Sequence, residues 1–180
     1  MRIDISIDST DAAAGSRDAA GGPDETAAEL ARIVADVTPK LLALDPGAVG
    51  DGHGWSARQI VGHLIDSAAN NHARFVRGQI EEDLVFEGYE QEEWVEVEGF
   101  DEEPWDELIE LWAAYNRHLA RVIARIDPLE WSRPRARHNF DRIGFASIEA
   151  SRLGTLGWLV VDYVAHLRHH LGQLDRLSRS

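Results

Sequence analysis

The chain has 180 residues and a formal net charge of -14 at pH 7, which argues against nucleic acid or an anionic membrane as its main partner. Hydrophobic residues make up 44% of it, enough for a sizeable core in one domain. It has no cysteine, so disulfides, thiolate ligands and thiol nucleophiles are excluded, and any metal must be held by His, Asp or Glu. No stretch is apolar enough to span a membrane, and the start lacks an apolar signal-peptide core. We therefore expect a cytoplasmic protein.

The first elements along the chain are a tail and a helix. Residues 1–22 are mostly small and polar, which predicts a flexible N-terminal tail, and residues 23–180 are expected to form a single domain. Apolar residues recur at helical spacing from residue 23 to residue 44. Pro39 falls inside that pattern and predicts a kink or a break near Thr38.

Three further helices follow. Ser56 and Gln59 form a capping box, which predicts a helix start there and a helix reaching residue 80. A seam of apolar residues predicts a third helix from Pro104 to Ile126, and Thr155 is a good N-cap for a fourth. The pattern predicts an all-α four-helix bundle. The link of residues 81–103 is too long for a tight turn and is expected to cross the length of the bundle.

Charge is segregated along the chain. Residues 81–110 contain fifteen Asp and Glu and no Lys or Arg, whereas residues 117–142 contain seven arginines. One interpretation is a solvated acidic crossover. Another is that the two segments attract each other, within one chain or across a dimer. The arginines at 133, 135 and 137 could also meet an anionic substrate.

Three histidines in the last helix form the most informative cluster. His166 and His170 are separated by four residues and so point the same way along a helix, as helical metal ligands do. On an ideal helical wheel His170 lies inside the apolar arc and His166 lies at its edge. His169 lies about 60 to 100° further out, which predicts a supporting or surface role for it.

His63 in the second helix is the expected partner of this pair. It lies about 10 Å into its helix, and His170 and His166 lie about 12 to 18 Å from the end of theirs, so antiparallel helices would bring the three imidazoles to similar height. His63 also shares a polar stripe with Ser67, Asn70 and Arg74. That stripe either faces water or lines a cleft with His63 at its metal end. The alternative for His63 itself is a hydrogen-bonded bundle histidine.

The other histidines carry a weaker signal. His53 and His138 lie in predicted loops, and His72 and His118 are isolated on their helices. We expect all four to be surface residues.

The segments GWSARQIVGHLIDSAANNHARFVR and DYVAHLRHHLGQL resemble the DinB/YfiT-like superfamily of metalloenzymes, and the likeness covers roughly residues 25 to 178. The resemblance implies a four-helix bundle in up-down-down-up order with a long crossover. It also implies one divalent metal, zinc or nickel, held by His63, His166 and His170. Members of the superfamily include thiol transferases, an isomerase and hydrolases, and they are often dimers, so the likeness implies a homodimer here.

The leading functional hypothesis is a metal-dependent enzyme acting on a small molecule. It would be an S-transferase using a low-molecular-weight thiol or a hydrolase using water, with the metal lowering the pKa of either. Asp66, one turn from His63, is a candidate base or supporting residue, although a solvated carboxylate is at least as consistent with its position. Arg74 is a candidate for binding a substrate anion. The alternative function is a non-catalytic, dimeric metal-binding or stress-associated bundle protein.

Overall fold

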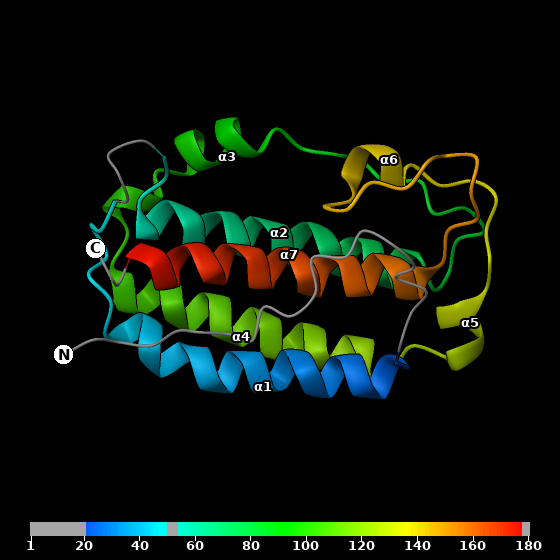
Figure 1. Ribbon diagram of the computed structural model, residues 1–180, viewed down its shortest axis with the longest axis horizontal. Coiled ribbons are helices and arrows are strands. Elements are labelled where there is room, and N and C mark those ends of the chain that lie inside the picture. Colours follow the sequence, from blue (N-terminus) through cyan, green and yellow to red (C-terminus); the bar gives the residue numbers. More distant parts are fainter. Residues whose placement is uncertain (1–20, 50–53, 178–180) are drawn as a thin grey trace.

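The computed structural model describes residues 21–49 and 54–177, so nearly all of the predicted tail, and His53, lie outside the described residues. Four long helices lie side by side: α1 (Pro23–Leu42), α2 (Ala57–Arg77), α4 (Trp105–Ile123) and α7 (Leu156–Leu177) (Figure 1). Within the described residues the only β-type pairings are two isolated bridges. The predicted all-α four-helix bundle is confirmed.

The helices follow an up-down-down-up order. In Figure 1, α2 and α4 run in one direction and α1 and α7 run in the other. Because α2 and α4 are parallel, the chain must travel back along the whole bundle between them. It does so through residues 78–104, which include α3 (Gln91–Glu98) and the short 3₁₀ helix η1 (Phe100–Glu102). This crossover agrees with the link length expected from the sequence.

The link between α4 and α7 contains α5 (Pro128–Ser132) and α6 (Phe140–Ile143) and is joined to the crossover. Leu84 N donates to Arg137 O at 2.9 Å, and the Asn139 amide bonds the backbone of Phe86 in both directions. An ion pair of 2.7 Å joins Arg137 to Asp83. The acidic and arginine-rich segments therefore attract each other within one chain, as one of the two interpretations predicted.

Local sequence signals predicted the starts of the helices more accurately than their ends. Ser56 Oγ accepts from Gln59 N at 3.1 Å, and Ser56 N donates to Gln59 Oε1 at 2.9 Å, so the predicted capping box is present. Thr155 Oγ1 accepts from Trp158 N at 3.0 Å and caps α7. However, α2 ends at Arg77 instead of reaching residue 80, and α4 ends at Ile123. The helix α1 continues through Pro39, so the chain does not break there, and a kink near Thr38 stays a prediction.

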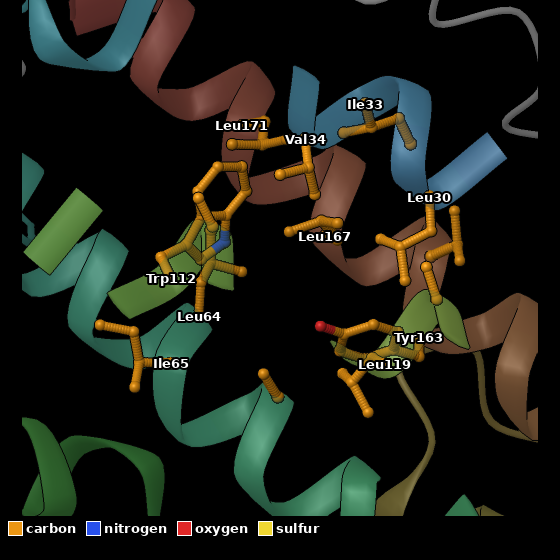
Figure 2. Close-up of a cluster of buried hydrophobic side chains, with 14 of the residues drawn as sticks. Leu30, Ile33, Val34, Leu64, Ile65, Trp112, Leu119, Tyr163, Leu167 and Leu171 are labelled. Carbon is orange, nitrogen blue, oxygen red and sulfur yellow. The ribbon is translucent and has the colours of Figure 1, made fainter. Parts of the chain in front are cut away.

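The core is a continuous set of apolar side chains from all four long helices. Figure 2 shows Leu30 and Val34 of α1, Leu64 of α2, Trp112 of α4 and Leu167 of α7 converging between the helices. All five are buried. Burial of this kind, at about 25 cal/mol per Å² of apolar surface, is the main source of folding free energy.

His138 was wrongly predicted to be a surface residue. It is buried, and its Nε2 lies 2.8 Å from Arg152 O, while Phe140 N donates to its Nδ1 at 3.2 Å. It fixes the link around α6. His72 is half-buried and His118 is exposed, and their rings lie 5.0 Å apart.

Candidate metal centre

The bundle brings His63, His166 and His170 together. One ring nitrogen of each lies within 4.8 Å of the others, and His63 Nε2 is 3.1 Å from His166 Nε2. His63 comes from α2, and the other two come from adjacent turns of α7. Because α2 and α7 are antiparallel, the three side chains meet at one height, as the sequence positions required.

The hydrogen-bond partners of the Nδ1 atoms indicate which ring nitrogen keeps its lone pair available for a metal. Gln173 Oε1 can only accept, so the 2.8 Å contact to it makes His170 Nδ1 the protonated nitrogen and leaves the lone pair on Nε2. His166 Nδ1 lies 3.3 Å from Ser67 Oγ, which directs its Nε2 toward His63. The arrangement of an inner Nε2 and a hydrogen-bonded Nδ1 is the usual one for metal-binding histidines.

Burial keeps these imidazoles neutral. Burial, together with the nearby His170, lowers the pKa of His63 to about 3. Burial also lowers the pKa of His166 to about 2, with contributions from the other three histidines around it, and lowers the pKa of His170. Neutral imidazole is the form that binds a metal. His63 Nε2 and His166 Nε2 face each other at 3.1 Å, close to the separation of two ligands on one tetrahedral ion, so the residues fit a divalent cation.

His169 lies beside this cluster but not in it. Its side chain is exposed, and its Nε2 lies 3.4 Å from Gln173 Nε2. The wheel therefore separated it correctly from His166 and His170. Gln173 is in contact with both His169 and His170 and links them.

A cavity of about 340 Å³ opens next to the cluster and includes His166 and His170 in its wall. Ser67 and Arg74 also line it, so this part of the polar stripe of α2 faces a cavity and not open water. Asn70 is not part of the wall; its neighbour Asn71 is, and sequence reasoning missed it. A helical turn of 3.6 residues allows either position to face the same groove, so only the packing could decide between them.

The wall opposite α2 comes from the loop after α6. The carboxylate of Asp162 accepts from Phe145 N at 2.7 Å and from Ala146 N at 2.8 Å, which ties this loop to α7. The Phe145 ring then lies 5.5 Å from the His166 ring and 5.2 Å from the His169 ring. The available sequence signal was that Asp162 precedes His166 by four residues and so shares its face.

Asp66 is buried, so the solvated carboxylate considered from the sequence is wrong. Among the described residues its Oδ2 has no hydrogen-bond partner. Burial, together with the nearby charge of Glu98, raises its pKa to about 7. Asp66 does not belong to the cavity wall, and its part in catalysis stays a prediction.

The comparisons with known proteins agree with this fold. The model of the DinB superfamily matches residues 16–174, and the chain belongs to that superfamily. A solved structure, YfiT from Bacillus subtilis, is similar with a TM-score of 0.73 over 92% of this chain and 91% of that one, at 20% sequence identity. It is described as a probable metal-dependent hydrolase with an unusual four-helix bundle topology, and at this identity the likeness shows the fold alone.

Two relatives are similar in sequence. A protein of Bacillus cereus (strain B4264) is 35% identical over 152 residues, which is 84% of this chain and 78% of the relative. A protein of Bacillus mycoides is 27% identical over 149 residues, covering 83% and 77%. Both are named "putative metal-dependent hydrolase". Separately, none of the helices in the described part of the chain is long and apolar enough to cross a membrane.

Proposed function

We propose that this protein is a metal-dependent enzyme acting on a small molecule, with His63, His166 and His170 as the ligands of one divalent ion. The observation that carries the proposal is the convergence of three neutral imidazole nitrogens, two of them from residues that line a cavity of about 340 Å³. Three protein ligands leave a coordination position for chemistry, as in catalytic zinc sites. Zinc and nickel both suit an all-imidazole site.

The residues of this chain have distinct tasks in the proposed site. His63, His166 and His170 hold the ion, which when bound supplies a Lewis acid and lowers the pKa of a water or thiol nucleophile. Gln173 and Ser67 fix the ring orientation of two ligands. The ring of Phe145 lies against those of His166 and His169 at one side of the proposed site.

Hydrolysis is the first version of this chemistry, because the relatives carry that name. The second version, transfer of a low-molecular-weight thiol to an electrophile, follows from the family resemblance seen in the sequence. A cytoplasmic homodimer is part of the same proposal. A binding protein without catalysis remains the alternative.

Metal content tests the centre. We expect one zinc or nickel ion per chain after incubation and desalting, with stoichiometric loss in His63→Ala and His170→Ala. His72→Ala is the matched control, since His72 is a half-buried histidine of α2, the helix that carries His63, and lies outside the cluster. Wild-type protein that stays metal-free after exposure to zinc, nickel and manganese would contradict the proposal.

The reaction class is then separated with the metal-loaded protein. Hydrolysis of ester and amide substrates that does not depend on added thiol supports the hydrolase. Product that forms from an electrophile only with a low-molecular-weight thiol supports the S-transferase. If both series fail while the metal stays bound, the non-catalytic alternative holds.

A further inference from the structure

Arg74 is a buried cation in the wall of the cavity. It lies on α2, only 6% of its surface is exposed, and it lines the same cavity as His166 and His170. Its Nη2 donates to Glu87 O at 2.9 Å. Within residues 21–49 and 54–177, no carboxylate lies within ion-pair distance of it.

A charged group in this position costs folding free energy unless something compensates it. Burial lowers the pKa of Arg74, but a guanidinium remains protonated in proteins. One backbone carbonyl engages one of its five N–H donors, and a carbonyl brings only a partial negative charge. Arg74 therefore lacks a full counter-charge where a ligand would be bound.

The rest of the cavity wall is also suited to an anion. Asn71 and Tyr89 add polar groups to it, whereas Arg142, which also lines it, is 82% exposed and lies 3.9 Å from Asp141. Burial raises the pKa of Tyr89, so its phenol stays a hydrogen-bond donor. Asp162 is the carboxylate in this wall, and its oxygens accept from Phe145 N and Ala146 N. Arg74 is thus the buried positive charge of this wall, in a chain of net charge -14.

The histidines and Arg74 lie at different heights along α2 in the wall of the cavity. Ser67 contacts His166 at the metal end, and Arg74 follows Ser67 by two helical turns, about 10 Å along the axis of α2. Helical side chains lean toward the N-terminus, which brings the guanidinium closer to the histidines. A small molecule could therefore place one end at the histidines and the other at Arg74.

We propose that Arg74 binds a carboxylate of the substrate, so that the protein acts on small organic acids whose reactive group lies at the histidine cluster. This rests on the proposed metal-dependent activity. A carboxylate matches the planar fork of a guanidinium with two parallel hydrogen bonds. One buried guanidinium also balances the single charge of a carboxylate better than the double charge of a phosphate monoester.

The test uses the metal-free full chain, so that the ligand cannot bind a metal instead. Butyrate and butyramide have the same shape and differ in charge, and their binding is followed by NMR titration. We expect wild-type protein to bind butyrate about tenfold more tightly than butyramide. The Nε–H resonance of Arg74 should shift with butyrate and stay in place with butyramide.

Variants assign the preference to Arg74. Arg74→Gln should bind both compounds alike, and Arg74→Lys should keep part of the preference because it keeps the charge but loses the fork. Arg77→Gln is the control, since Arg77 lies on the same helix but is exposed and paired with Glu81 at 2.7 Å. Equal binding of the two compounds by wild-type protein, or an unchanged preference in Arg74→Gln, would overturn the proposal.

The result of the butyrate test can be distinguished from the result of the metal-binding test. If the protein holds stoichiometric metal but shows no preference for butyrate, the carboxylate site is wrong and the metal centre stands. If it prefers butyrate through Arg74 but binds no metal, the enzyme proposal fails and the anion site stands. The Arg74 resonance in wild-type protein decides the question even if Arg74→Gln does not fold.

Discussion

The two helix pairs of the bundle differ in what they bury. Between α1 and α4 the buried side chains are almost all apolar, and they include Val34 and Leu41 of α1 and Trp112 and Leu119 of α4. Where α2 meets α7, the buried and half-buried side chains include His63, His166 and Arg74, and a cavity opens beside them.

This difference separates stability from chemistry. An apolar seam contributes folding free energy in proportion to the area buried, whereas desolvated polar groups cost free energy unless they are paired. The α2/α7 pair therefore bears the free-energy cost of burying histidines and Arg74, which the mostly apolar α1/α4 seam does not. Changes in the two pairs should consequently have different effects.

The largest expected effect is a loss of stability without loss of metal. Leu119→Ala, at a fully buried position of α4, should lower the free energy of unfolding by about 2 to 5 kcal/mol. The folded variant should still bind one metal ion. Urea denaturation and metal analysis check both parts, with Leu111→Ala as the control, because Leu111 is half exposed on the same helix. Loss of metal from folded Leu119→Ala would show that the two pairs are not independent.

The reverse effect is expected from Gln173→Ala. It removes the acceptor that orients His170, so the affinity for zinc should fall roughly 10- to 100-fold while the thermal stability of the metal-free protein changes little. Competition with a chromophoric chelator measures the affinity. Gln79→Ala serves as the control, because Gln79 bonds Phe75 O away from the centre. An unchanged affinity would mean that packing alone orients His170.

The smallest effect concerns Asp66 and depends on pH. Its pKa is about 7 in the folded protein against 3.8 ordinarily, so its contribution is complete below pH 3.8 and is lost as the pH rises through 7. Above pH 7 the fold must bury a carboxylate. Asp66→Asn should therefore stabilise the protein by about 1 to 3 kcal/mol at pH 8 and by less at pH 5.

Thermal unfolding of wild type and variant at the two pH values measures this difference. Asp106→Asn, at an exposed position of α4, should show no such pH dependence. An equal effect of Asp66→Asn at both pH values would mean that Asp66 in the folded protein does not change its ionisation between them.

The sequence predicted local features well because they depend on near neighbours in the chain. The capping box of Ser56 and Gln59 needs only three residues of separation, and the common face of His166 and His170 needs only four. His63 became the third candidate ligand because its depth in its helix matches that of His166 and His170 when the two helices are antiparallel. The helix does not break at Pro39, because tertiary packing can hold a helix together where one backbone hydrogen bond is lost.

The features that sequence reasoning missed all depend on contacts between distant segments. His138 is buried because the link around α6 folds over it. Asp162 holds the loop before α7 in place because its carboxylate accepts hydrogen bonds from two backbone amides of that loop. Asn71 lines the cavity where Asn70 was expected.

The sequence by itself thus determined the four long helices, their apolar and polar faces and the three candidate ligands, since helical periodicity and spacing encode these directly. Only the tertiary structure decided that Asp66 is buried, that Arg74 faces the cavity without a carboxylate partner among the described residues, and that Phe145 lies against the histidines. These properties arise from desolvation and from the meeting of α2, α7 and the two long links. No single segment of the chain contains that information.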